Sequence, residues 1–259
     1  MKKIYFMLAY ARRKAHRPLL EQVIENLRAD GFEVSTGVAE ALSIVPEQIK
    51  VEADLYVLKS HSSFWLNIAA VLDTQGARIL NSYPSCVDTN NKIRTASRLS
   101  GADVPIPRSW VTGDLAQILE ATDAKQFLIK PNFGRWGNGI RIINDRDELA
   151  AAQIMDGMLV QELITPIEDE LKLYVIGERV FGMRKNPSTD ERLPVAADPT
   201  LECIALRCGR ALGLEIYGVD VLIGRRGPVV VDVNYFPSFR GVPNAAGPLT
   251  DHIKEFAAK

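Results

Sequence analysis

Three oxygen-bearing side chains in the C-terminal part of the chain have the types and spacing of a metal site. Asp232 and Asn234 are two residues apart in a strand-like apolar segment, so their side chains point to the same face. The glycines at 224 and 227 predict a hairpin that brings Asp220 beside them. Carboxylate and amide oxygens suit Mg²⁺, which completes its coordination with water and phosphate oxygens. A solvated strand end is the alternative interpretation.

A glycine-rich segment begins just after Lys130. Lys130 ends a strand-like apolar segment, and Gly134, Gly137 and Gly139 follow it. Glycines let backbone amides approach an anion closely, and a lysine adds positive charge for a phosphate. The spacing matches neither of the common nucleotide-binding glycine motifs. A phosphate site and a simple glycine-rich turn therefore both remain open.

Two further segments carry groups that suit a nucleotide. The apolar stretch 158–162 runs into an acidic segment, so it could offer backbone groups to an adenine and carboxylates to ribose hydroxyls. Arg184 and Lys185 end another strand-like segment, where their charges could stabilise a transferring phosphoryl group. A plain edge strand and a solvated cationic pair are the alternatives.

The N-terminal elements that must position these residues alternate between two types. Strand-like segments at 4–9, 32–34, 54–59 and 78–81 alternate with helical spacing at 18–28 and 64–72. Such alternation indicates a parallel sheet covered by helices. We expect this α/β domain to span residues 1–84.

The rest of the chain mixes helices and strands without a repeat. The spacing predicts helices at 87–100, 115–121, 145–152, 201–212 and 249–258. It predicts strands at 109–111, 126–130, 140–143, 158–162, 170–176, 179–184, 218–223 and 229–234. Gly213 ends the fourth of these helices, as a C-terminal glycine would.

Composition narrows the class of protein. The chain has 259 residues, of which 47% are hydrophobic and 24% charged, so it is globular. Its net charge of −1 argues against a nucleic-acid or membrane-surface partner. Three cysteines without CxxC spacing predict no metal or redox site. No apolar stretch approaches the roughly 18 residues of a membrane span, and we expect a cytoplasmic location.

The near-zero net charge hides two local imbalances. Residues 1–30 carry seven basic and three acidic side chains, a local charge of +4. Residues 144–170 carry eight acidic side chains and one arginine, a local charge of −7. We expect the basic region to lie near an anionic substrate and part of the acidic region to border the nucleoside.

The order of these parts resembles the ATP-grasp superfamily. The segments that begin at Lys130, Glu170 and Gly218 look like those of RimK-type carboxylate–amine ligases. The closing segment that begins at Asp232 is more similar to that of inositol trisphosphate kinases, and RimK-type ligases normally have Glu at this position. The resemblance implies an α/β chain, with an ATP-grasp fold over 85–259 and a small parallel-sheet α/β domain before it. Two α+β subdomains, at about 105–160 and 161–259, would clamp ATP.

The resemblance also implies roles for individual residues. Lys92 and Lys130 would hold the ATP phosphates under a lid that contains Gly134, Trp136, Gly137 and Gly139. Gln161, Glu162 and Leu163 would contact adenine, and Glu168 the ribose. Arg184 would face the γ-phosphate and act with Lys130 in catalysis. Asp220, Asp232 and Asn234 would bind one or two Mg²⁺ ions, for which Mn²⁺ could substitute. Glu170 and Lys172 stand where RimK-type enzymes commonly have Asp and Arg, and of these two we place Lys172 at the ATP site.

Two reactions are compatible with this resemblance. The favoured one is an ATP- and Mg²⁺-dependent carboxylate–amine ligase that works through an acylphosphate of a small anionic substrate. The alternative is a kinase that phosphorylates an inositol phosphate or a similar polyanionic polyol. We expect the anion to be bound by a set of basic side chains: Arg12, Arg13, Lys14, Arg17, Lys59, His61, Lys185 and Arg240. Homo-oligomers are common in the superfamily, but the sequence marks no interface.

Overall fold

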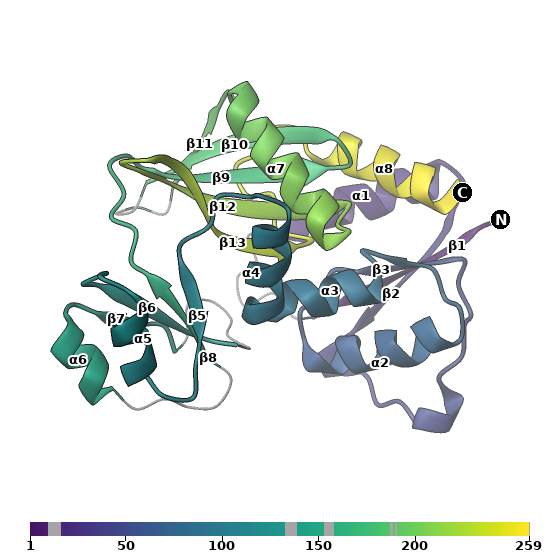
Figure 1. Ribbon diagram of the computed structural model, residues 1–259. Helices are drawn as coiled ribbons and strands as arrows, with labels where there is room; N and C mark the ends of the chain where they lie inside the picture. Colours follow the sequence, from purple (N-terminus) through teal and green to yellow (C-terminus); the bar gives the residue numbers. More distant parts are fainter. Residues whose placement is uncertain (10–16, 133–138, 153–157, 187–188, 190, 259) are drawn as a thin grey trace.

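The computed structural model describes residues 1–9, 17–132, 139–152, 158–186, 189 and 191–258 (Figure 1). Its helices are α1 (Arg17–Ala29), α2 (Ser63–Thr74), α3 (Tyr83–Asn90), α4 (Lys92–Gly101), α5 (Ala116–Ala121), α6 (Arg146–Ala151), α7 (Pro199–Leu212) and α8 (Ala246–Ala258). Short 3-10 helices cover Ala39–Ala41 and Pro46–Gln48. In the described part of the chain, no helix has both the length and the apolar composition needed to cross a membrane.

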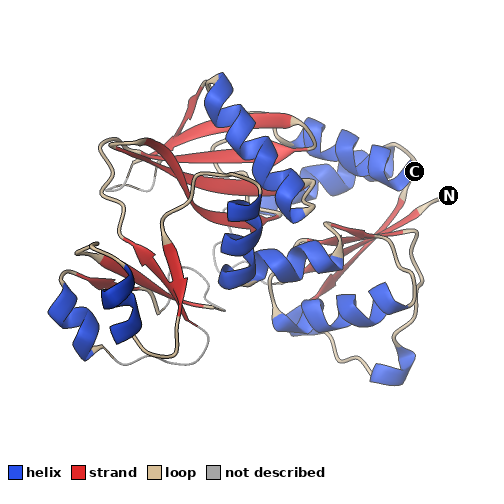
Figure 2. Cartoon of the chain, in the orientation of Figure 1, coloured by secondary structure: helices blue, strands red, loops and turns tan. Residues whose placement is uncertain are grey.

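The N-terminal part forms a parallel sheet with strand order β2-β1-β3-β4. Its strands are β1 (Lys3–Leu8), β2 (Glu33–Val38), β3 (Leu55–Leu58) and β4 (Ile79–Leu80). Helices α1 and α8 lie on one side of this sheet, and α2 and α3 lie on the other (Figures 1 and 2). All four β3 residues are buried, as expected for a strand covered on both faces.

The second sheet is antiparallel, with strand order β11-β10-β9-β12-β13. Its strands are β9 (Glu170–Ile176), β10 (Arg179–Lys185), β11 (Arg192–Val195), β12 (Ile216–Gly224) and β13 (Gly227–Tyr235). Strands β12 and β13 form the predicted hairpin, which turns at Arg225 and Arg226, and Gly227 at the start of β13 has a φ of 107°. The register shifts after Asp220, where a bulge leaves Val231 as an extra residue on β13.

The third sheet is also antiparallel and has strand order β5-β8-β6-β7. Its strands are β5 (Ser109–Val111), β6 (Phe127–Pro131), β7 (Arg141–Ile143) and β8 (Met158–Glu162). Helices α5 and α6 pack on it around a separate hydrophobic core that includes Ile118, Phe127 and Leu149. The parallel sheet and the five-stranded sheet instead share one continuous core.

Polar contacts reinforce that shared core. At the end of β4, the buried Asn81 side chain accepts hydrogen bonds from the backbone amides of Glu215 (2.7 Å) and Ile216 (3.0 Å) and donates one to the Ile216 carbonyl (2.7 Å). At the opposite ends of the strands, Lys2 before β1 and Arg78 before β4 donate to carbonyl groups in the last turn of α8. The parallel sheet therefore contacts both β12 and α8.

The structure differs from the sequence expectations at three elements. The single helix expected at 87–100 is two helices, because Asn91 has extended backbone angles (φ −102°, ψ 110°) and caps α4. Strand β11 was not expected and contains Pro194, which an edge strand tolerates. Strand β8 lies between β5 and β6, so it is not an edge strand.

Candidate functional site

A row of charged side chains crosses one face of the five-stranded sheet. Lys172 on β9 pairs with Asp220 on β12, and Asp220 pairs with Asp232 on β13. Residues directly opposite one another in a sheet share a face, as do residues two apart on one strand. Asn234 therefore lies on this face too, and its side-chain amide donates to Asp232 Oδ2 at 3.0 Å. The structure thus brings together the three residues that the sequence assigned to a metal.

Each of the two carboxylates is paired with a lysine. Lys172 Nζ lies 2.5 Å from Asp220 Oδ1, and Lys92 Nζ donates to Asp232 Oδ1. Lys92 is the first residue of α4, where the Asn91 side chain accepts from the Arg94 amide. Asn132, which precedes the glycine-rich segment, accepts from the Lys92 backbone amide at 3.1 Å through its carbonyl oxygen. The helix cap and the end of β6 together hold Lys92 against Asp232.

Lys130 approaches the same place from the third sheet. Its ammonium donates to the carbonyl oxygen of Val231 at 2.9 Å. Val231 is the extra residue of the β13 bulge, and a bulge disrupts the regular ladder at that point. The irregularity in β13 therefore provides the acceptor that holds Lys130 one residue from Asp232.

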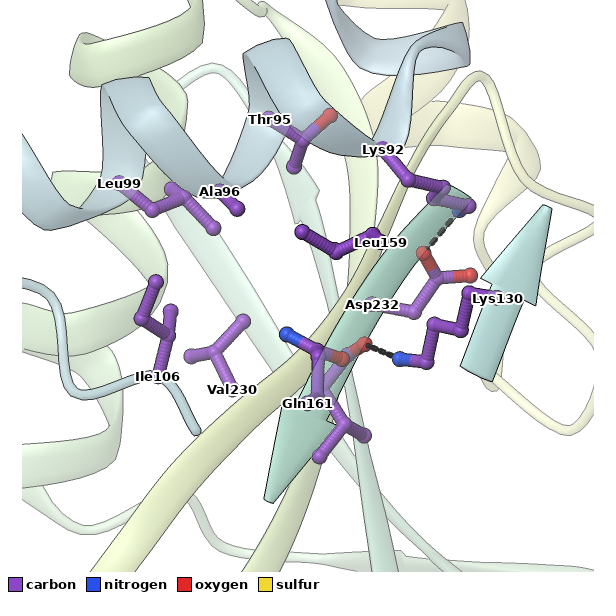
Figure 3. Close-up of a pocket in the computed structure, with 11 residues that line it drawn as sticks. Lys92, Thr95, Ala96, Leu99, Ile106, Lys130, Leu159, Gln161, Val230 and Asp232 are labelled. Carbon is purple, nitrogen blue, oxygen red and sulfur yellow. Dashed lines mark hydrogen bonds and ion pairs between the residues drawn. The ribbon is translucent and has the colours of Figure 1, made fainter. Parts of the chain in front are cut away.

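These side chains line a narrow pocket between α4, β6, β8 and β13 (Figure 3). Its polar lining is Lys92, Thr95, Lys130, Gln161 and Asp232, and its apolar lining includes Leu99, Ile106 and Val230. Gln161 Nε2 donates to Ser109 Oγ at 2.9 Å, whereas the buried Gln161 Oε1 has no hydrogen-bond partner among the described residues. A buried acceptor without a donor is costly. The lining thus combines an apolar wall with an acceptor and two cations, which are groups that a base and a phosphate chain would need, but the free volume of about 20 Å³ has room for a water molecule only.

The site shifts the pKa values of its members in different directions. Burial raises the pKa of the Asp220 carboxyl, and Lys172 only partly offsets this rise. Burial also acts to raise the pKa of Asp232, but the charges of Lys92, Lys130 and Lys172 together outweigh it and the net shift is downward. Burial lowers the pKa of Lys130, whereas Asp220 raises the pKa of Lys172 despite burial. Asp232 is therefore the more readily ionised of the two carboxyl groups.

The residues assigned to adenine lie at the end of β8, but their backbone amides are already bonded. The Glu162 amide donates to the Arg108 carbonyl at 2.9 Å, and the Leu163 amide donates to the Gln126 carbonyl at 3.0 Å. The Glu162 carboxylate lies 3.8 Å from Arg108 Nε. Glu168 is exposed in the segment between β8 and β9. Of these four residues, Gln161 is the one that lines the pocket.

The structure does not place Arg184 with the carboxylates. Met183 is directly opposite Lys172, so Arg184, the next residue, points to the other face of the sheet, where it is exposed. Arg192 on β11 lies on the carboxylate face and donates to the Tyr174 hydroxyl. Sequence reasoning counted Arg192 only among the cations in loops near the presumed cleft, because its place on this face depends on the pairing of β11 with β10.

The basic residues assigned to the substrate are distributed over several elements. Lys185 lies on the carboxylate face, 2.7 Å from Glu170 Oε2. Lys59 donates to the Phe236 carbonyl at 2.9 Å, and the His61 ring stacks on Tyr235 at a centroid distance of 3.8 Å. Arg240 is partly buried and precedes Gly241, which lies against Met183 and Arg192.

Some assigned residues cannot be placed. Arg12, Arg13, Lys14, Gly134, Trp136 and Gly137 lie outside the described residues. Arg17 is the first residue of α1. Gly139 is described, and its φ of 80° is a conformation that favours glycine.

The donor set at the carboxylates fits magnesium better than zinc or iron. In the described ranges, no group of three or more His, Cys, Asp or Glu side chains is arranged to hold a metal ion. The set instead consists of two carboxylates and one amide on adjoining strands. Mg²⁺ is held in this way when phosphate and water oxygens complete its coordination. The lysines beside the carboxylates could bind the phosphate groups of a nucleotide whose oxygens complete this coordination.

Comparison with known proteins identifies the family. Residues 89–251 match the RimK-like ATP-grasp domain, and the chain belongs to this family. A probable alpha-L-glutamate ligase of Xanthomonas campestris is 26% identical over 210 residues, which cover 71% of this chain and 72% of that protein. A probable alpha-L-glutamate ligase 2 of Shewanella amazonensis is 25% identical over 238 residues, covering 79% and 77%.

Solved structures agree on the fold. A RimK-domain ATP-grasp protein of Sphaerobacter thermophilus has a TM-score of 0.79 and 21% identity, and the match covers 97% of this chain and 98% of that chain. A D-alanine–D-alanine ligase of Bacillus anthracis has a TM-score of 0.73 and 17% identity, covering 100% and 98%. The expected α/β ATP-grasp fold is confirmed. The chain is an ATP-grasp enzyme, and the relatives from Xanthomonas campestris, Shewanella amazonensis and Bacillus anthracis carry the names of ligases.

Proposed function

We propose that this protein is an ATP- and Mg²⁺-dependent carboxylate–amine ligase that acts on a small anionic substrate. The proposal depends mainly on two ion pairs at one face of the five-stranded sheet. Lys92 pairs with Asp232, and Lys172 pairs with Asp220. Lys130 adds a third cation beside them. Three buried or half-buried lysines around two carboxylates suit a polyphosphate and its metal ion.

In this proposal, Asp220, Asp232 and Asn234 hold Mg²⁺, and Lys92 and Lys130 hold phosphate oxygens. Mg²⁺, when bound, neutralises charge that develops between the β- and γ-phosphates. A substrate carboxylate oxygen attacks the γ-phosphorus, so that an acylphosphate and ADP form. An amine then attacks the acyl carbon, and an amide, inorganic phosphate and a proton result.

The substrate would lie on the same sheet face, beyond Lys172. Arg192 and Tyr174 are joined there, and the segment with Arg240 and Gly241 packs over them. A guanidinium is well suited to bidentate recognition of a carboxylate. The names of the relatives, alpha-L-glutamate ligases and a D-alanine–D-alanine ligase, support an amino acid or a similar carboxylate as the substrate class.

The reaction class is tested by product stoichiometry. The protein is incubated with ATP, Mg²⁺ and pairs of candidate carboxylates and amines, and ADP and free phosphate are followed together. A ligase releases ADP and phosphate in equal amounts only when acid and amine are both present. ADP formation with phosphate retained on an alcohol would instead show the kinase and overturn the proposal.

Variants at the site test the assignment of residues. Lys130→Met and Asp232→Asn are both expected to lower turnover by at least about 100-fold, since each removes charge that faces the transferring group. Arg184→Met is the matched control, because its side chain lies on the other sheet face, and it is expected to retain activity. Full activity of the Lys130 and Asp232 variants would show that the site lies elsewhere.

A further inference from the structure

The strand that carries Asp232 and Asn234 ends in an unusual turn. Phe236, the residue after β13, is almost fully buried and has a φ of 38°. A bulky side chain rarely adopts a positive φ, and such a conformation persists only where the surroundings hold it. The turn lies two residues from Asn234. Whatever holds Phe236 therefore also fixes the end of β13.

Residues of the loop that follows β3 make the contacts that hold this turn. Lys59, directly after β3, donates its ammonium to the Phe236 carbonyl at 2.9 Å and lies 5.5 Å from the centre of the Phe236 ring. The Tyr235 hydroxyl donates to the Ser60 carbonyl at 3.0 Å. The His61 ring stacks on the Tyr235 ring, with an interplanar angle of 22°. The three consecutive residues 59–61 thus contact Tyr235 and Phe236, the two residues that follow Asn234.

The chemistry of Lys59 supports a structural use of its charge at this turn. A lysine that gives its ammonium to a backbone carbonyl inside the protein loses hydration, and only a directed contact offsets that loss. Here the directed contact falls on the residue with the positive φ. The second contact, from the Phe236 amide to the Ile216 carbonyl (2.8 Å), comes from within the five-stranded sheet.

We infer that Lys59 is a positioning residue for the metal site, which it supports by holding the turn at Phe236 and so fixing Asn234 and Asp232. Lys59 would then act through the backbone of β13 and would not be a contact to the acceptor substrate. The parallel sheet would have a direct part in metal binding, although it contributes none of the proposed ligands. This inference rests on the proposed metal site.

The experiment measures how strongly Mg²⁺ enhances ADP binding. Calorimetric titration with ADP, in the presence and in the absence of Mg²⁺, gives the ratio of the two affinities for each variant. Lys59→Met keeps the length of the side chain but removes the donor. It is expected to lower the Mg²⁺ enhancement about tenfold, the factor associated with one lost hydrogen bond to a charged group, and to leave metal-free ADP binding unchanged.

Two further variants complete the test. Tyr235→Phe removes the hydroxyl contact to Ser60 but keeps the stacked ring, and it is expected to lower the enhancement by a smaller factor. Lys254→Met is the matched control, because its ion pair with Asp30 (2.6 Å) ties α8 to the end of α1, away from this turn. Its Mg²⁺ enhancement is expected to equal that of the wild type.

The outcomes separate this inference from the proposed function. If ADP binding to the wild-type protein does not respond to Mg²⁺, the proposed metal site is wrong. If the wild-type protein responds and Lys59→Met responds equally, the inference about Lys59 is wrong while the metal site stands. If Lys59→Met does not fold, an unchanged enhancement in Tyr235→Phe overturns the inference.

Discussion

Lys172 and Lys185 both neutralise a carboxylate on the same sheet face, but at different depths. The Lys172 and Asp220 side chains are 13% and 15% exposed, whereas those of Lys185 and Glu170 are 28% and 27% exposed. A buried charge that loses its partner is much more costly than a solvated one. The pair at Lys172 should therefore dominate the stability of this face.

Urea unfolding of two matched variants tests this difference. Lys172→Met leaves the buried Asp220 carboxylate without its cation and should lower the free energy of unfolding by about 3 kcal/mol. Lys185→Met should lower it by less than about 1 kcal/mol. The difference between these two losses should become smaller at acidic pH, because burial raises the pKa of Asp220 and protonation removes the charge of this carboxylate. Equal losses in the two variants would contradict this account.

Lys59 should make the free energy of unfolding depend on pH. Burial lowers the pKa of Lys59 from 10.5 to about 8. At pH 7 both states carry the proton, and keeping the charge buried costs about 3 kcal/mol. Between pH 8 and 10.5 the unfolded chain binds more protons than the folded chain, so the contribution of Lys59 to stability rises with pH.

The Lys59→Met variant should reveal this rise. From pH 7 to pH 10, the free energy of unfolding of the wild type should rise by about 2 kcal/mol relative to that of the variant. Urea unfolding at the two pH values measures the change. A difference that does not vary with pH would show that the ammonium is not desolvated in the folded protein.

At the residue scale, the sequence predicts which residues of one hairpin lie together better than it predicts which sheet face a residue of another strand occupies. Asp220, Asp232 and Asn234 could be grouped because a hairpin and a period of two are local properties. The choice between Arg184 and Arg192 depends on which residue of β10 faces Lys172, and no local pattern sets that register. Val231 as the acceptor for Lys130 follows from a bulge, which sequence patterns do not show.

At the element scale, α4 connects helix capping to the proposed phosphate site at Lys92. Its first residue is Lys92, and its N-cap is Asn91, whose side chain accepts from the Arg94 amide at 3.0 Å. Loss of an N-cap costs about 1 kcal/mol and frays the first turn. Fraying at this end moves Lys92, so the cap should matter for ligand binding as well as for stability.

A pair of cap variants separates these two effects. Asn91→Ala should lower the free energy of unfolding by about 1 kcal/mol and weaken metal-free ADP binding several-fold. Asp198→Ala removes the cap of α7, which accepts from the Thr200 and Leu201 amides. It should cost similar stability but leave ADP binding unchanged, as measured by calorimetry. Equal ADP affinities in the two variants would refute the link between the cap and Lys92.

The helix break at Asn91 also shows why this element could not be predicted in full. The stretch 87–100 has no proline or glycine, so its spacing predicts one helix. The break arises because Asn91 leaves the helical region and Asn132, 41 residues later, accepts from the Lys92 amide. A distant acceptor of this kind cannot be read from local spacing.

At the scale of the whole molecule, two hydrophobic cores meet at the site. The parallel and five-stranded sheets share the larger core, and the sheet with β6 and β8 has the smaller one. Lys130 and the pocket lie where these bodies meet. A nucleotide bound there would contact both bodies and should restrain the smaller one.

Hydrogen exchange followed by mass spectrometry tests this arrangement. Without ligand, amides of β6 and β8 should exchange faster than those of β9 and β12, because a smaller core gives less protection. ADP with Mg²⁺ should slow exchange in β6 and β8 and change that of β1 and β3 little. Uniform slowing over all three sheets would show that the cores do not open independently.

The contact between β1 and α8 bears on how the chain is made. Lys2 Nζ donates to the Ala257 carbonyl at 2.5 Å, across 255 positions of sequence. The ribosome adds about 5–20 residues each second, so the strands of the parallel sheet wait on the order of 10 s for the helix that covers one of their faces. During that interval, apolar side chains of the nascent sheet are exposed. We therefore expect the nascent parallel sheet to need protection by chaperones until α8 has been made.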